Sequence, residues 1–179
     1  EVHGDPTEGA LIVAAAKAGR SVTEAAEQVP RLDVIPFESE RQYMATLHDM
    51  GPDQPRVAYI KGAAEVLLAK CGGALDAAGQ PVSCRAEELY QMADAMARRG
   101  LRVLAFARKQ LPASTTVITH DDMADGLTLV GLQGMIDPPR PEAMAAIRVC
   151  QGAGIRVKMI TGDHALTAVA IGGQLGLGG

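Results

Sequence analysis

Alternating and helix-spaced apolar residues divide the chain into strands and helices. Asp5-Pro6-Thr7-Glu8 has the composition of a helix N-terminus, because Asp5 can cap free amides and Pro6 needs no hydrogen bond there. The Ala-rich run behind it predicts a helix to about Gly19. Alternation predicts strands over 41–48 and 56–60, and the turn-rich residues between them make the pair antiparallel. Further elements expected here are helices over 24–28, 64–70 and 87–99 and a strand over 101–107.

The pattern changes near Gly126. A strand over 127–135, a helix over 141–151, a strand over 155–160 and a helix over 164–175 follow, the alternation typical of a parallel α/β sheet. The sequence therefore predicts an α+β fold, in which an antiparallel sheet flanked by helices precedes a partial parallel α/β segment. We expect two domains, 1–125 and 126–179. Because both ends of the sequence lie beside a predicted helix, we expect a piece of a longer protein.

Composition narrows the class of protein. The 179 residues are 47% hydrophobic and 21% charged, which suits a folded soluble domain rather than a disordered chain. A net charge of −4 without a Lys/Arg-rich run argues against a nucleic-acid partner. Three cysteines without a Cys-x-x-Cys pair and four scattered histidines predict neither a disulfide framework nor a metal site. No apolar run reaches the roughly 18 residues of a membrane span.

Phe37 is the first candidate binding residue. The chain has two Phe, three Tyr and no Trp, yet Phe37 directly follows Pro36 and precedes the polar run Glu38-Ser39-Glu40-Arg41. An exposed ring here would offer a flat face to a ligand. The alternative is an ordinary core residue, since large apolar side chains are mostly buried.

Lys61 and Arg102 are the candidate cations. Lys61 stands beside Gly62 at the end of a predicted strand, where an amine suits a phosphate or a ring, although an isolated lysine is more often a solvated charge. Arg102 is polar within an apolar strand. It either reaches a ligand or pairs with an acid such as Glu8.

Two segments between predicted strands and helices could bind an anion or act as a hinge. Thr161-Gly162-Asp163 falls at the strand edge where open α/β sheets bind ligands, and free helix amides there favour an anion. The same tripeptide is equally a plain helix cap. Asp137-Pro138-Pro139-Arg140 is a rigid turn because of its prolines, and its functional interpretation is a hinge.

Six short motifs together point to one family. They are Gly4-Asp5-Pro6-Thr7-Glu8-Gly9-Ala10-Leu11, Pro36-Phe37-x-Ser39-x-Arg41-x-x-Met44, Lys61-Gly62-Ala63, Leu101-Arg102-Val103-Leu104-Ala105, Asp137-Pro138-Pro139-Arg140 and Met159-Ile160-Thr161-Gly162-Asp163-His164. Over nearly its whole length the chain resembles the cytoplasmic nucleotide-binding domain, plus part of the haloacid dehalogenase-like phosphorylation domain, of P-type cation-transporting ATPases. The calcium-pump-like branch is the most similar.

The resemblance implies a nucleotide pocket. In the family, the phenylalanine matching Phe37 stacks on adenine, and the glutamate matching Glu8 lies at the adenine end. The lysine matching Lys61, with Gly62 beside it, lines the bottom of the pocket. The arginine matching Arg102 reaches the phosphates. Together these residues would bind ATP.

The resemblance also implies an accessory phosphate face. The aspartates matching Asp137 and Asp163, with Thr161 and Gly162, belong to the face that receives the γ-phosphate and its Mg²⁺. The Asp-Lys-Thr-Gly-Thr segment that carries the phosphorylated aspartate does not occur in this sequence. These residues alone are therefore not expected to form the aspartyl phosphate.

The implied function is an ATP-binding module of a cation pump, calcium being the branch-level expectation. Its partners would be ATP and the remaining domains and membrane helices of the parent, with the module on the cytoplasmic side of a bacterial inner membrane. One departure is Gln42, which stands where the family commonly has lysine, and Arg41 could replace the lost charge.

Two other functions stay open. A stand-alone haloacid dehalogenase-like phosphatase would suit the strand–helix alternation, but the sequence has no Asp-x-Asp nucleophile motif. A non-catalytic interaction domain would bury Phe37 in the core.

Overall fold

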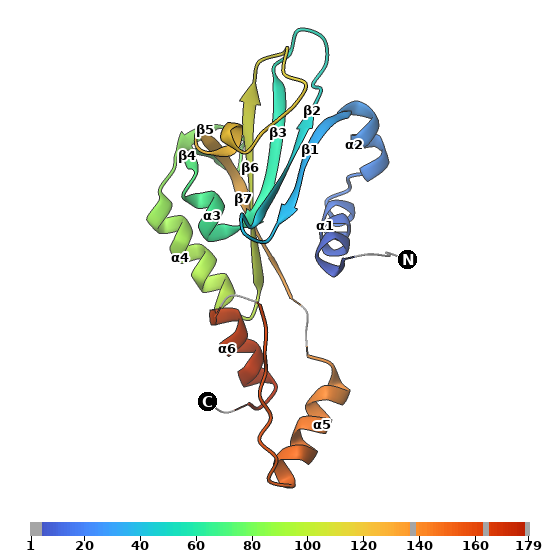
Figure 1. Cartoon of the computed structure of the whole chain (residues 1–179), viewed down its shortest axis with the longest axis vertical. Helices are drawn as coiled ribbons and strands as arrows, with labels where there is room; N and C mark the ends of the chain where they lie inside the picture. The colour runs from blue at the N-terminus through green and yellow to red at the C-terminus, as the bar shows by residue number, and fades with distance from the viewer. Residues whose placement is uncertain (1–4, 137–138, 163–164, 178–179) are drawn as a thin grey trace. The chain divides into compact units, whose positions relative to one another are not determined.

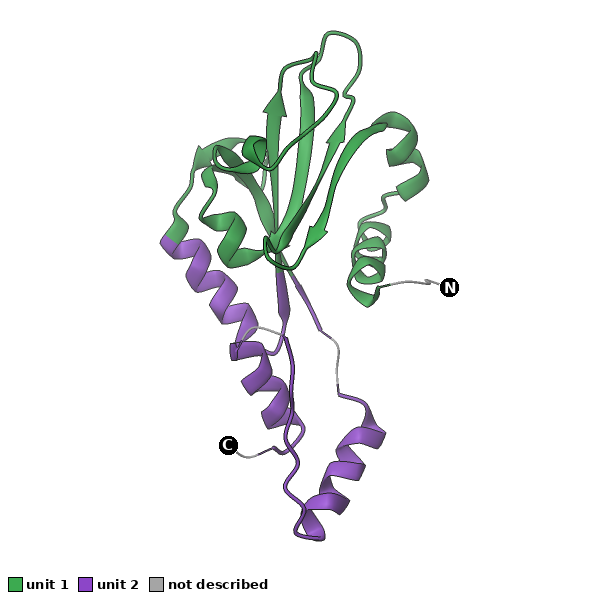
Figure 2. Ribbon diagram, viewed as in Figure 1, with its two compact units in different colours: residues 1–86, 104–133 green, residues 87–103, 134–179 purple. Residues whose placement is uncertain are grey.

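A computed structural model describes residues 5–136, 139–162 and 165–177 (Figure 1). Its elements are α1 (Pro6–Lys17), α2 (Val22–Gln28), β1 (Arg31–Glu38), β2 (Tyr43–His48), β3 (Arg56–Ala63), α3 (Ala64–Leu68), β4 (Cys71–Leu75), β5 (Pro81–Ser83), α4 (Ala86–Ala97), β6 (Arg102–Leu111), the 3-10 helix η1 (Asp121–Met123), β7 (Leu127–Met135), α5 (Pro141–Gly152) and α6 (Ala165–Gln174). By packing, the chain forms two compact units (Figure 2): Glu1–Ala86 with Leu104–Gln133, and Glu87–Val103 with Gly134–Gly179.

Seven strands form one mostly antiparallel sheet in the order β1-β2-β3-β6-β7-β4-β5 (Figure 1). The pairs β1–β2, β2–β3 and β3–β6 are antiparallel. Strand β4 pairs antiparallel with β5 and parallel with β7. The expected α+β class and the antiparallel pair β2–β3 are confirmed.

One face of this sheet carries the core of the first unit. In β2, Tyr43, Ala45 and Leu47 are buried and alternate with half-buried residues. The register places Ala45 between Ile35 of β1 and Ile60 of β3, which are also buried. Buried side chains from α3 and from the connection between β6 and β7 complete this core: Leu67, Leu68, Ile118 and Met123.

The opposite face is only partly covered. Met44, Lys61 and Phe106 lie side by side in register across β2, β3 and β6, and all three are half-buried. Tyr59, two residues before Lys61, is exposed. This face is therefore accessible to a ligand along the row that contains Lys61.

Helix α1 begins as the sequence predicts. The Asp5 carboxylate accepts hydrogen bonds from the amides of Thr7, at 2.8 Å, and Glu8, at 3.3 Å, and Pro6 occupies the first helical position. Such a cap satisfies amides that have no partner within the helix. It also fixes Glu8 in the first turn.

Three strands are missing from the sequence prediction. No strand is predicted over 31–38. Pro36 cannot donate to a strand ladder, and it is tolerated in β1 because β1 is an edge strand. Strand β4 begins at Cys71-Gly72-Gly73, which was interpreted as the end of a helix. Strand β5 has only three residues and reads as a polar loop.

The expected partial parallel sheet in the last third of the sequence is wrong. Residues 155–160 form no strand, and the side chains of Ile155 and Ile160 are exposed, Ile160 by 98%. A parallel strand needs neighbours for its backbone groups, and within the described residues this segment pairs with none. Strand β7 instead joins the seven-stranded sheet.

The second unit contains helices α4, α5 and α6, all expected from the sequence. Thr167 of α6 is buried and donates a hydrogen bond of 3.0 Å to the carbonyl of Leu101. Gly134 allows the strand to pack closely on its neighbours, because a Cβ there would lie 2.7 Å from Met96 and 2.8 Å from Leu101.

The two domains expected on either side of residue 126 stay a prediction. None of the described helices is both long and apolar enough to cross a bilayer.

Candidate functional site

Phe37 lies at a β-bulge. Glu38 is three positions after Ile35 on β1, but their partners Tyr43 and Ala45 on β2 are only two positions apart, so β1 has one extra residue here. In a regular strand Phe37 would share the buried face with Ile35, because side chains two apart point the same way. Ile35 is 5% exposed whereas Phe37 is 60% exposed. The interpretation of Phe37 as a core residue is therefore wrong.

Lys61 and Glu8 meet in an ion pair. The Lys61 ammonium on β3 contacts the Glu8 carboxylate in the first turn of α1. The Lys61 side chain is only 21% exposed, whereas that of Glu8 is 55% exposed. Lys61 is thus not a freely solvated charge, and Glu8 forms its ion pair with this lysine.

Gly62 permits close contact between β3 and the start of β2. A Cβ at Gly62 would lie 2.5 Å from the carbonyl oxygen of Gln42 and 2.7 Å from the Cβ of Tyr43. The Gln42 carbonyl also accepts a hydrogen bond of 3.0 Å from the amide of Ala63. Gln42 has a φ of 56°, in the left-handed region. Gly62 therefore allows the turn between β1 and β2 to pack directly on β3.

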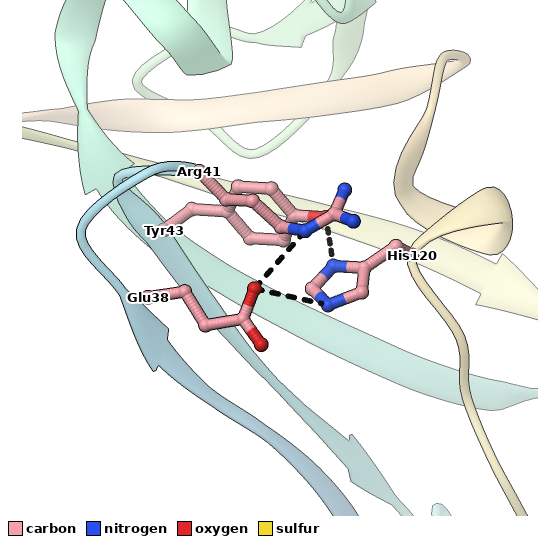
Figure 3. A network of polar contacts seen from close by, with 4 residues as sticks. All are labelled: Glu38, Arg41, Tyr43 and His120. Carbon is pink, nitrogen blue, oxygen red and sulfur yellow. Dashed lines mark hydrogen bonds and ion pairs between the residues drawn. The ribbon is translucent and has the colours of Figure 1, made fainter.

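A polar cluster surrounds this turn (Figure 3). The hydroxyl of Tyr43 and Nδ1 of His120 are hydrogen-bonded at 2.7 Å. On the other side of the imidazole, Nε2 lies 3.6 Å from a carboxylate oxygen of Glu38. The same oxygen accepts a hydrogen bond of 3.0 Å from Nε of Arg41. Glu38 is therefore shared between an arginine of the turn and a histidine 82 positions later.

Burial raises the pKa of Tyr43, with Arg41 lowering it and Glu38 and Asp121 raising it further. Its hydroxyl therefore stays protonated at neutral pH, so its O–H is available for the hydrogen bond with His120. The Tyr43 ring also meets the imidazole edge-on, with centroids 5.7 Å apart, and the Lys70 ammonium lies 5.7 Å from the ring centroid. These contacts fix the first residue of β2.

No local pattern of residues predicts this cluster. Tyr43 occupies an unspecified position of the phenylalanine motif, and His120 was one of the scattered histidines. The contact joins residues far apart in sequence, which no local pattern reveals. The network also involves Arg41, the residue expected to replace a lysine at Gln42, because its guanidinium pairs with Glu38.

The pocket residues gather at one end of the sheet of the first unit. Glu38, Tyr43 and Gly62 are successive partners across β1, β2 and β3, so Phe37 and Lys61 each lie one residue from this row. Adjacent strands in a sheet are about 4.8 Å apart, so β1 and β3, which have β2 between them, are about 10 Å apart. A flat ring, a cation and an acid at this spacing are suited to binding a ligand that has both a flat and an anionic part.

The remaining candidates belong to the second unit. Arg102 is the first residue of β6 and is exposed. Thr161 and Gly162 are exposed and lie outside any helix or strand. Asp137 and Asp163 lie outside the described residues. Within the described ranges, no three His, Cys, Asp or Glu side chains come together as ligands for a metal ion.

Comparison with known proteins agrees with the motifs. A family model described as P-type ATPase, cytoplasmic domain N, matches residues 1–142. A cation-transporting ATPase of Synechocystis is 54% identical over 98% of this chain, and a probable cation-transporting ATPase of Mycobacterium tuberculosis is 44% identical over 99%. A calcium-transporting ATPase of Listeria monocytogenes is 40% identical over 97%.

The match covers the chain but only part of each relative. The chain spans 19% of the Synechocystis and Mycobacterium proteins and 20% of the Listeria protein. The matched model describes a pump domain rather than a stand-alone phosphatase. The family model and the identity over almost the whole chain establish that this chain belongs to the P-type cation-transporting ATPase family, with cytoplasmic domain N covering most of its length.

Proposed function

We propose that this chain is the ATP-binding module of a cation pump and that the Phe37 ring stacks on the adenine. The observation that carries the proposal is the exposure of this ring at the bulge of β1, in a chain of the P-type ATPase family. An exposed aromatic ring adds little to the core, but its face can stack on a nucleobase. The half-buried residues Met44 and Lys61, which lie side by side on β2 and β3, support the same site.

Around the ring, Lys61 and Gly62 form the bottom of the pocket and Glu8 lies at its adenine end. The ion pair with Glu8 holds the Lys61 ammonium in one place, so less side-chain freedom is lost when a ligand binds. Arg102 contacts the phosphates.

The accessory residues Asp137, Thr161, Gly162 and Asp163 receive the γ-phosphate. In the complete pump the module places that phosphate in line with an aspartate that lies elsewhere in the parent, a positioning role in phosphoryl transfer. Mg²⁺, when bound with ATP, neutralises phosphate charge. Because no metal-binding group of side chains occurs in the described part of the chain, we expect the ion to enter with the triphosphate.

The transported ion is proposed to be calcium. Relatives at 40% identity are named calcium-transporting, whereas those at 54% and 44% are named only cation-transporting. We place the module on the cytoplasmic side of a bacterial inner membrane, where it works with the membrane helices of its parent. Uptake of Ca²⁺ against other divalent cations by vesicles carrying the whole pump tests the ion, and uptake without Ca²⁺ preference would contradict it.

ATP titration followed by amide NMR tests the pocket. We expect saturable shifts at Glu8, Phe37, Lys61 and Arg102 with a dissociation constant between high micromolar and millimolar, or about −4 to −5 kcal/mol. Phe37→Ala should abolish saturation while leaving the melting temperature nearly unchanged, because the ring is exposed.

Val34→Ala is the matched control, since Val34 is also an exposed apolar residue of β1. This variant should bind ATP like the unmodified chain. A spectrum unchanged at several millimolar ATP would contradict the proposed function. Equal loss in both variants would show that the effect belongs to the strand rather than to the ring.

A further inference from the structure

Phe37 is held only weakly by the sheet. Strand β1 is an edge strand, so β2 is its single strand neighbour. The bulge between Ile35 and Glu38 interrupts that pairing where Phe37 lies, and Pro36 has no amide to donate. The strand ladder therefore constrains the ring little, and the turn that follows Phe37 is its next support along the chain.

The turn after Phe37 is closed at its backbone. The amides of Arg41 and Gln42 donate to the carbonyl of Glu38 at 3.1 Å and 2.7 Å, and Gln42 is tied to β3 through Ala63. The side chain of Glu38, the residue after Phe37, takes no part in these backbone hydrogen bonds. Its contacts are with Arg41 of the same turn and with His120.

His120 contacts both ends of the turn. It is hydrogen-bonded to Tyr43, the residue after the turn, at 2.7 Å and lies 3.6 Å from Glu38, the residue before it (Figure 3). A neutral imidazole can accept from the Tyr43 hydroxyl at Nδ1 and direct its Nε2 hydrogen toward the Glu38 carboxylate. One side chain thus bridges the two strands across the turn.

The segment that carries His120 is itself anchored. The Ile118 amide donates to the Asp33 carboxylate of β1 at 2.8 Å, and the amide of Thr119 donates to the Asp122 carboxylate at 2.7 Å. The Lys109 ammonium donates to the carbonyl of Asp122 at 2.7 Å. Beyond these bonds, Met123 is fully buried. His120 therefore projects from a fixed support rather than from a loose loop.

We propose that His120 is a positioning residue for the nucleotide site: through Tyr43 and Glu38 it holds the turn over residues 38–42, and with it the Phe37 ring and Arg41, in the orientation that binds the nucleotide. This inference rests on the proposed function. The histidine does not touch the nucleotide. Its removal leaves every pocket side chain present but loosens the turn that orients Phe37 and Arg41.

The first test needs no nucleotide. Exchange of the Arg41 and Gln42 amides with water, measured by NMR, should accelerate at least about threefold in His120→Ala, because the turn opens more often. Amides of β3 away from the turn, over residues 56–60, should be unaffected, whereas the Ala63 amide is bonded to the turn itself. Tyr43→Phe removes only the hydroxyl and should produce part of the same acceleration. Unchanged exchange at both amides in His120→Ala overturns the proposal.

The second test is ATP affinity. His120→Ala should raise the dissociation constant about three- to tenfold, the range expected from the loss of the hydrogen bond to Tyr43 together with the 3.6 Å contact to Glu38. His120→Asn can keep the bond to Tyr43 and His120→Gln the contact with Glu38, so at least one should recover part of the affinity. If both behave like the alanine variant, these contacts do not position the site and the proposal fails.

His48→Ala is the control. His48 also makes two side-chain hydrogen bonds, to the carbonyl of Val29 and the hydroxyl of Thr46, but at the opposite end of β2. His48→Ala should leave the amide exchange rates and the ATP affinity unchanged.

If the unmodified chain binds no ATP, the proposed function and the nucleotide role of His120 are both overturned, while the exchange rates still decide whether His120 holds the turn. If the chain binds ATP and His120→Ala binds equally well, only the inference about His120 is overturned.

Discussion

Lys61 on β3 forms an ion pair with Glu8 in the first turn of α1, which ties the N-terminal helix to the middle of the sheet. Both residues are proposed to line the nucleotide pocket. The carboxylate offsets the lysine charge, so the pocket presents less positive potential to a triphosphate than Lys61 alone would.

This pair should be worth little to stability. Since Glu8 is more than half exposed, a double-mutant cycle with Glu8→Gln and Lys61→Met should give a coupling energy of about 0.2–1 kcal/mol in urea unfolding. The coupling should fall in 1 M salt, at which charges are screened within about 3 Å. A coupling that survives high salt unchanged would mean that packing of the lysine stem, not charge, joins the two residues.

Gln42→Lys should strengthen ATP binding. Gln42 lies in the turn beside Gly62, at the position for which the family resemblance implies a lysine. Two unit charges about 4 Å apart in water attract by about 1 kcal/mol, so affinity should rise about fivefold at low salt. Gln42→Met, of similar length without charge, is the control. Isothermal titration at two salt concentrations checks this, and equal affinities of the lysine and methionine variants would contradict it.

Gly62→Ala should destabilise the first unit. The added Cβ would meet the backbone of Gln42 and Tyr43, which cannot move aside like a flexible side chain. We expect a loss of about 1–3 kcal/mol, read from the denaturant midpoint. At Gly131 of β7 a Cβ would meet nothing within 4 Å, so Gly131→Ala should be nearly neutral. Alanine lowers the entropy of the unfolded chain, which by itself would stabilise both variants, so similar losses at both positions would show that the close approach at Gly62 is not the cause.

Asp122 should make stability depend on acid pH. Hydrogen bonds from the amide and hydroxyl of Thr119 lower the pKa of the Asp122 carboxyl, burial raises it slightly, and Lys109 lowers it further. Because the folded-state pKa lies below the unfolded value, the stabilisation is fully present above the unfolded pKa of about 3.9 and is lost as pH falls through the folded value.

Asp122→Asn is the matching variant. It should be less stable than the unmodified chain by about 0.5–1.5 kcal/mol at pH 7, and the difference should shrink below about pH 4. Melting curves from pH 7 to pH 2 measure it, with Asp121→Asn as the neighbouring control. A difference that stays constant over this range would mean that charge is not the cause.

Local signals in the sequence were sufficient for most helices and for the regular strands. The cap at Asp5, the alternation of β2 and the apolar stripe of α4 act over a few residues, and those elements are present. The motif order also identified the family. Strand β1 was missed because Pro36 carries the signal of a break, and only its place at the sheet edge makes the proline acceptable.

Residues 155–160 are the reverse case, a strand that was predicted but is not formed. Its alternating apolar residues predict a buried strand, but a strand exists only when a neighbour satisfies its backbone groups. The described chain supplies none for this segment. A pattern of side chains can show that a segment is suited to a sheet, but it cannot supply the partner.

By itself, the sequence determined the class of fold, the family and the candidate residues of the pocket, because these depend on residue types at short spacings. Tertiary structure alone decided that Phe37 is exposed, that Lys61 is paired with Glu8 and that His120 bridges Tyr43 and Glu38. The physical reason is that a bulge in one strand and contacts between residues more than 50 positions apart depend on strand register and packing, which arise only when the whole sheet is assembled.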